Sequence, residues 1–225
     1  MILAVCGGKG GVGKSTLTVE LAAALDAVAV DSDLGMADLP RGRGPDLHDV
    51  LAGRAEPAAA LRSGPVDLLP CGRSLAGARA ADVGRLAETM ATITEHRDAV
   101  LDCPAGLRAD AGVPLAVADA CIVVASPREW ALADALRTRE LARELDTGLV
   151  AVALNRAGED APQATVRDAL GAPTVVVPTD PRLAESLSGV EPVVERAPES
   201  APGRAIGELA AAVESCRPYH DSHRE

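Results

Sequence analysis

The sequence predicts a doubly wound α/β fold, in which a mostly parallel β-sheet is flanked by helices. Short apolar runs alternate with longer segments of helical periodicity along the 225 residues. The apolar runs show no polar alternation, as expected for strands buried on both faces of a parallel sheet. Ligands in such sheets bind beyond the carboxyl ends of the strands. Glycines and acids follow several of the apolar runs, so a ligand site is expected at that edge.

The expected elements succeed one another along the chain. Strands are expected at residues 2–6, 27–31, 65–70, 99–103, 120–126, 148–156 and 173–178. Helices are expected at residues 15–25, 47–53, 81–96, 128–146 and 203–216. We expect a single domain, residues 1–216, followed by a polar tail at 217–225.

Composition and charge narrow the classes of function. Hydrophobic residues make up 48% of the chain, with one Trp, one Tyr and no Phe, which indicates a globular core of small and branched side chains. A net charge of −11 argues against broad adhesion to nucleic acid or anionic lipid. The scarcity of lysine fits either a salt-adapted proteome or a GC-rich genome, and the sequence leaves both open.

The cysteines indicate a reducing compartment. The chain has five, at positions 6, 71, 103, 121 and 216. No CxxC pair occurs among them, so a zinc ribbon or thioredoxin-like pair is not expected. The start MILAVCGG lacks a basic segment, and no apolar run approaches the ~20 residues of a membrane span. We therefore expect a cytoplasmic protein with reduced, structural cysteines.

The stretch GKGGVGKS, residues 8–15, matches the phosphate-loop pattern G-x-x-x-x-G-K-[ST] between an expected strand and an expected helix. Its glycines let backbone N–H groups turn toward phosphate oxygens at a helix N-terminus. Lys14 is expected at the β- and γ-phosphates, Ser15 at Mg²⁺ and Thr16 near the α-phosphate. The expected nucleotide contacts in this loop are Gly8, Lys9, Gly10, Gly11, Val12, Gly13, Lys14, Ser15 and Thr16.

Carboxylates end two of the expected strands. Asp31 and Asp33 are two apart on an extended segment, so both point toward the bound phosphates. Either could act on water, and a capped turn is the alternative for each. Asp102 ends the apolar run 99–102 in the manner of a Walker B acid, which holds the Mg²⁺ shell. The expected metal-site residues are thus Ser15, Asp33 and Asp102.

Lys9 and Lys14 are the only lysines in the chain. Their pattern, KGGVGKST, resembles the deviant Walker A motif of the MinD/ParA ATPases. In that family the first lysine reaches across a dimer interface to the partner's nucleotide, which implies this position for Lys9. The resemblance is nearest to the MinD branch and spans about residues 1–215.

Two further motifs carry the same resemblance. DSDLG, residues 31–35, resembles switch I of the family, which implies that Asp33 positions the hydrolytic water and Asp31 supports the loop. The segment after Asp102 resembles switch II. Its residues are Cys103, Pro104, Ala105 and Gly106. A packing role for the Cys103 side chain is expected rather than a redox one.

Later segments extend the likeness. Asn155 and Arg156 resemble the family's strand-end Asn-Arg, which implies that Asn155 contacts the adenine edge, and Pro178 would pack on the ring. Glu129 and Asp134 are candidate partners of Lys9 in the unliganded state. Charge compensation at a helix N-terminus is the alternative for both.

The resemblance implies a Mg²⁺-dependent ATPase that forms an ATP-dependent homodimer, turns over slowly and is stimulated by an unidentified protein partner. The tail RPYHDSHRE lacks the basic amphipathic helix of membrane-bound relatives, so no direct membrane anchor is expected. Asp38 also stands where the family often has Asn. Alternatives are a nucleotide-gated scaffold with vestigial hydrolysis, a ParA-like segregation ATPase, and a ligase of the dethiobiotin synthetase kind.

Overall fold

The computed structural model describes residues 1–40, 42–72, 74–106, 109–127, 129–158 and 160–217, with only the backbone at 109–111 and 129–131. Its strands are β1 Ile2–Cys6, β2 Val28–Asp31, β3 Leu68–Leu69, β4 Ala99–Asp102, β5 Ala120–Ala125, β6 Gly148–Asn155 and β7 Thr174–Val177. These strands form one sheet in the order β3-β2-β4-β1-β5-β6-β7, and every pairing between them is parallel.

Helices connect the strands. They are α1 Lys14–Ala24, α2 Leu47–Leu51, α3 Pro57–Ala60, α4 Leu75–Ala80, α5 Leu86–Thr94, α6 Ala109–Val117, α7 Glu129–Glu144, α8 Gln163–Leu170, α9 Pro181–Glu185, α10 Val193–Arg196 and α11 Ala201–Ser215. Two 3₁₀ turns, η1 Val83–Arg85 and η2 Ser186–Ser188, precede α5 and follow α9. Within the described part of the chain, no helix has the length and apolar character needed to cross a bilayer.

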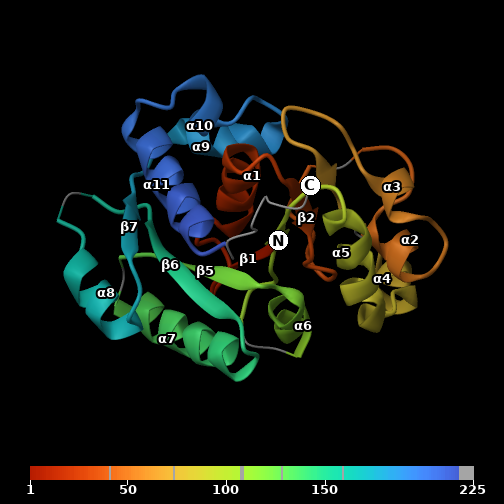
Figure 1. The fold of residues 1–225 in the computed structure, drawn as a ribbon, viewed down its shortest axis with the longest axis horizontal. Coiled ribbons are helices and arrows are strands. Elements are labelled where there is room, and N and C mark those ends of the chain that lie inside the picture. The colour runs from red at the N-terminus through yellow and green to blue at the C-terminus, as the bar shows by residue number, and fades with distance from the viewer. Residues whose placement is uncertain (41, 73, 107–108, 128, 159, 218–225) are drawn as a thin grey trace, which may run out of the picture.

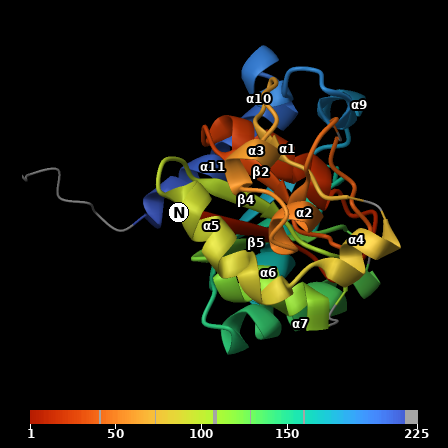
Figure 2. The same cartoon turned by 90° about the vertical axis from the view of Figure 1, so that its right-hand side faces the viewer.

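The sheet is covered on both faces, as the continuous apolar runs predict (Figures 1 and 2). Successive strand residues point to opposite sides. Val28 and Val30 join one buried cluster with residues of α2, α5, α7 and α8. Ala29 joins the other, which contains residues of α1, α9, α10 and α11. The doubly wound fold class predicted from the sequence is therefore confirmed.

The elements differ from the expectations mainly beside one edge of the sheet. Strand β3 spans two residues rather than 65–70, because it pairs only with β2 and the chain turns back through an antiparallel bridge between Arg62 and Leu68. The helix expected at 81–96 is divided into η1 and α5, since the Asp82 side chain accepts a hydrogen bond from the Gly84 N–H and caps the 3₁₀ turn. The short helix α4 has no counterpart among the expected elements.

The strand register places the predicted acids side by side. Asp31 is directly opposite Asp102 on neighbouring strands, and Asp102 is opposite Val5 near the end of β1. Strand β1 lies between β4 and β5 in the sheet. Strands β2, β3 and β4 are on one side of β1, and strands β5, β6 and β7 are on the other, so the order of the strands reverses at β1. This reversal is the point where ligand crevices form in open α/β sheets.

Candidate functional site

The phosphate loop turns sharply between β1 and α1. Gly11 and Gly13 have φ angles of 76° and 99°, a left-handed conformation that suits glycine. Gly13 is also the N-cap of α1, and among the described residues no side chain caps this helix and no acid stands in its first turn. The first N–H groups of α1 and its dipole are therefore available to an anion.

Two side chains at the end of β6, those of Asn155 and Arg156, donate hydrogen bonds to carbonyl groups of the phosphate loop. The Asn155 side-chain amide donates from Nδ2 to the Val12 carbonyl over 2.7 Å, and its Oδ1 accepts from the Arg156 N–H at 2.9 Å. The Arg156 guanidinium donates to the Gly11 carbonyl at 2.9 Å. Because these contacts hold the carbonyls outward, they favour inward-facing N–H groups in the loop. The expected contact of Asn155 with a base stays a prediction.

Replacement of Gly13 by alanine should destabilise this loop. An added Cβ would lie 2.2 Å from Asn155 Nδ2, at a φ of 99° that strains any L-residue. We expect Gly13→Ala to lower the free energy of unfolding by about 1–3 kcal/mol, measured by urea denaturation. Gly11→Ala is the matched control, because its φ of 76° is also strained but nothing lies within 4 Å of the added Cβ. Equal losses in both variants would contradict the steric contact with Asn155.

Two buried carboxylates lie opposite each other at the ends of β2 and β4. The exposed fractions of Asp31 and Asp102 are 0% and 2%. Burial raises the pKa of Asp102 to about 7, opposed by a hydrogen bond from the Ser15 hydroxyl, and the neighbouring Asp31 raises it further. Burial likewise raises the pKa of Asp31 to about 6. Both groups are in an environment that would favour a bound cation.

One carboxylate oxygen has no protein partner. Asp102 Oδ1 is buried and accepts no hydrogen bond from the described residues. A buried acceptor of this kind calls for an unseen donor or ion. A magnesium shell beside Ser15 meets that need, because Mg²⁺ usually keeps several waters and takes only one or two protein ligands beside phosphate oxygens. Within the described residues, no group of three or more metal-binding side chains occurs.

The switch-like loop after β2 is held at both ends by Asp31. Its carboxylate accepts from the Asp33 N–H at 3.3 Å and from the Leu39 N–H at 3.0 Å. Within the loop, Asp33 Oδ1 accepts from the N–H groups of Gly35 and Met36. Asp31 thus holds the loop through two main-chain contacts, and the switch role expected for it stays a prediction. The Asp33 carboxylate caps a turn, as in the alternative role expected from the sequence for this residue.

A cavity of about 320 Å³ brings the loop and the acids together. The predicted residues that line it are Gly10, Gly11, Gly13, Lys14, Ser15, Thr16, Asp33, Ala105 and Arg156. Met36, Asp38 and Leu187 complete its wall without having been predicted there. A smaller hollow of about 60 Å³ continues from Gly13 and Thr16 toward Asn155 and Pro178, on the side where a base is expected.

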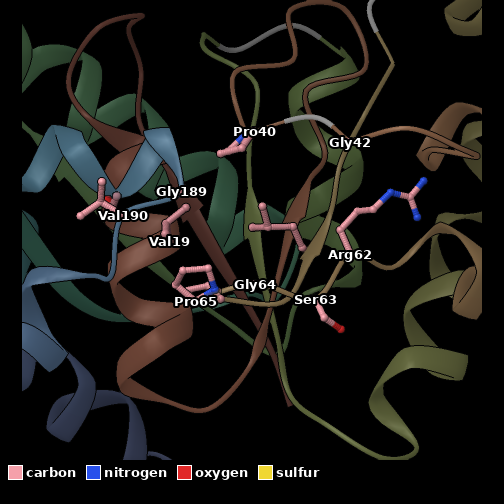
Figure 3. A pocket seen from close by; sticks show the side chains of 12 residues that line it. Val19, Pro40, Gly42, Arg62, Ser63, Gly64, Pro65, Gly189 and Val190 are labelled. Atoms are coloured by element: carbon pink, nitrogen blue, oxygen red, sulfur yellow. The ribbon is translucent and has the colours of Figure 1, made fainter.

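A second cavity of about 300 Å³ lies between α1, η2 and the turn before β3 (Figure 3). Its walls are largely apolar, with Val19 and Pro65 among the residues labelled there. None of the expected phosphate-binding residues lines it. The cavity beside the phosphate loop, and not this apolar one, therefore has the lining that suits a phosphate ligand.

The two lysines of the phosphate loop differ in burial, and the loop packs against α7. Lys14 is buried, with 8% exposed, and Lys9 is exposed on the same loop. A Cβ at Gly8 would lie 2.5 Å from Asp134 Cβ, so the loop rests on α7, and Asp134 forms an ion pair with Arg137 at 3.2 Å. The side chain of Glu129 lies outside the described residues. The pairing of Lys9 with either acid stays a prediction.

The expected switch II segment follows β4 directly. Cys103 and Pro104 are buried, and Gly106 has a φ of 92°. Burial raises the pKa of the Cys103 thiol, and the charge of Asp102 raises it further, so a reactive thiolate is disfavoured. Cys103 is therefore a buried packing residue next to Asp102.

Sequence reasoning missed two residues that position the site. The Ser32 hydroxyl donates to the Asp102 carbonyl at 2.7 Å and joins the ends of β2 and β4. Glu20 on α1 is fully buried and accepts from the N–H groups of Val193 and Val194 at 3.0 and 3.1 Å, which anchors α10. An acid on the buried face of a helix was the available signal for Glu20, whereas Ser32 carried none.

A glycine loop at the uncapped start of α1, a buried lysine and two buried acids at the switch point define a P-loop nucleotide-binding protein. Comparison with known proteins identifies the family. The chain belongs to the CobQ/CobB/MinD/ParA nucleotide-binding domain family, whose model matches residues 3–193.

Individual relatives agree with this membership. An uncharacterized ATP-binding protein of Methanocaldococcus jannaschii is 32% identical over 226 residues, covering 93% of this chain and 86% of that protein. The cell division ATPase MinD of Pyrococcus furiosus has a TM-score of 0.87 at 30% identity, covering 96% of this chain and 99% of that one. The septum site-determining protein MinD of Pyrococcus horikoshii, solved with Mg-ADP, has a TM-score of 0.86 at 31% identity over 95% of each chain.

Proposed function

We propose that this protein is a Mg²⁺-dependent, ATP-hydrolysing switch that dimerises on ATP and positions or regulates a protein partner. The observation that carries the proposal is the unpartnered Asp102 Oδ1 at the end of β4, beside the phosphate loop and its buried Lys14. A cation with its water shell and a triphosphate would together satisfy this acid and the free N–H groups of α1.

Each group has a separate task in this proposal. Lys14 and the loop N–H groups would hold the β- and γ-phosphates, and Ser15 and Asp102 would hold Mg²⁺, whose contribution would be to offset negative charge on the phosphate oxygens. Asp33 lines the same cavity as Lys14 and orients the attacking water. Catalysis of this kind depends on positioning and charge, so slow turnover with stimulation by a partner is expected.

The relatives support the nucleotide and the metal. The Pyrococcus horikoshii MinD structure is a complex with Mg-ADP, and the Pyrococcus furiosus protein is described as a cell division ATPase. Both align over nearly the whole of this chain. We extend their nucleotide and ATPase activity to this protein, with a homodimer and an unidentified protein partner as its working state.

Phosphate release from the purified protein tests hydrolysis. We expect Asp33→Ala to lower the rate by about tenfold or more while ATP still binds, because the variant loses the group that orients water and keeps the phosphate loop. Asp168→Ala is the control, since that carboxylate is 71% exposed on α8. Equal rates for Asp33→Ala and wild type, both well above the background without protein, would contradict the assignment of Asp33, whereas equal rates at that background bear on the second candidate below.

A second candidate function is a nucleotide-gated scaffold with vestigial hydrolysis. The observation in its favour is the turn that Asp33 Oδ1 makes with the Gly35 and Met36 N–H groups, which engages this oxygen within its own loop. Wild-type phosphate release no faster than that of Asp33→Ala, with ATP still bound, would favour the scaffold.

A further inference from the structure

We propose that His48 is a positioning residue that holds the loop carrying Asp33 in place through the main chain of Leu34. The inference rests on the proposed function, since it concerns the same loop, and it adds a residue that no sequence motif singles out. His48 lies on α2, and its imidazole Nε2 is 3.0 Å from the carbonyl oxygen of Leu34, the residue after Asp33.

The imidazole is held by a rigid support. The N-cap Asp46 accepts from the His48 N–H at 2.9 Å and forms a capping box with Asp49. The Leu47 N–H donates to the Pro70 carbonyl at 2.9 Å, and the Leu47 side chain is fully buried. Helix α2 is therefore tied to the segment after β3 and does not depend on the loop that it contacts.

The pocket of the ring is shaped to fit it. His48 is 2% exposed, and a Cβ at Gly72 or Gly77 would lie 2.8 or 2.7 Å from its Nδ1. Two glycines therefore leave the space that the ring occupies. A side chain at either position would push the ring toward the Leu34 carbonyl or out of its place.

The tautomer follows from the partner. A carbonyl oxygen only accepts, so Nε2 carries the hydrogen and donates it to Leu34. Nδ1 is buried and has no partner among the described residues. A buried polar atom without a partner is costly. The contact with Leu34 is therefore the one hydrogen bond of this ring within the described residues.

The loop needs an external support at this point. Asp31 fixes the Asp33 and Leu39 N–H groups, and Asp33 makes its own turn with Gly35 and Met36. His48 adds a contact from a different element between those two supports. Without it, the Leu34 carbonyl loses its donor from α2, and the position of Asp33 relative to the phosphate loop depends only on the two supports within its own loop.

Two variants separate the hydrogen bond from packing. His48→Leu fills the pocket without a donor, whereas His48→Gln can place an amide N–H near the position of Nε2. We expect His48→Leu to lower kcat for ATP hydrolysis by about tenfold, with KM for ATP changed by less than about threefold. His48→Gln should recover kcat to within about threefold of wild type. His96→Leu, at an exposed histidine, is the control.

Amide hydrogen exchange of the nucleotide-free protein gives a readout that does not depend on hydrolysis. The peptide spanning 32–39 should exchange about tenfold faster in His48→Leu than in wild type and recover in His48→Gln. Equal exchange in wild type and His48→Leu, or an equal increase in both variants, would overturn the inference. If wild type releases no phosphate, the proposed hydrolysis fails, and the exchange data still decide the place of His48.

Discussion

Lys14→Ala should weaken ATP binding by about 100-fold or more, equivalent to about 3 kcal/mol. Lys14 is the first residue of α1 and is 8% exposed, so its ammonium group is largely removed from water and is directed to the site by the loop around it. Hydrogen bonds from an ammonium to phosphate oxygens are charge-assisted and strong in such surroundings. Isothermal titration of Mg-ATP into wild type and variant measures the difference.

Two comparisons make this result specific. Lys14→Arg should also bind poorly, because a broad planar guanidinium does not fit among the glycines as a compact ammonium does. Arg204→Ala removes an exposed cation on α11 and should bind like wild type. An affinity of Lys14→Ala within about threefold of wild type would show that Lys14 does not contact the phosphates.

The phosphate loop could be predicted from the sequence because its chemistry is local. Consecutive residues must form the turn, the helix start and the lysine contact, so the motif at 8–15 contains the whole arrangement. The same holds for Asp31 and Asp102. Each ends a continuous apolar run, and the parallel register then brings the two together.

The supports of the site could not be predicted, because they depend on contacts distant in sequence. Asn155 meets Val12 across 143 positions, and Glu20 meets Val193 across 173. His48 meets Leu34 only because α2 packs beside the loop after β2. No local periodicity encodes these pairs. The family resemblance placed Asn155 at a base, and the structure adds its bond to the loop.

The edge of the sheet was hard to predict for a related reason. The apolar run 65–70 predicts a strand of ordinary length, yet β3 pairs with a single strand of the sheet, β2, and has two residues, with only the isolated Arg62–Leu68 bridge on its other side. Pairing partners set the length of an edge strand, and local propensity does not report them. The short helix α4 likewise depends on its Ser74 cap, which accepts from the Gly77 N–H.

Lys9→Ala should leave ATP affinity within about threefold of wild type and abolish the ATP-dependent dimer. The two lysines of the loop differ: Lys14 is buried and lines the cavity, whereas Lys9, five positions earlier in the sequence, is exposed. An exposed ammonium beside the phosphate site is placed to meet a second nucleotide when two chains associate about a two-fold axis. Each chain would then supply Lys9 to the phosphates of its partner.

Light scattering with Mg-ATP and phosphate release measure the two consequences. We expect wild type to double its mass on ATP and Lys9→Ala to remain a monomer, with hydrolysis lower by about 100-fold. The Asp33→Ala variant is the comparison, because it should dimerise on ATP and persist as a dimer when hydrolysis is blocked. A Lys9→Ala protein that dimerises and hydrolyses like wild type would show that Lys9 is not required at the partner's nucleotide, and the proposed contact across the interface would then be wrong.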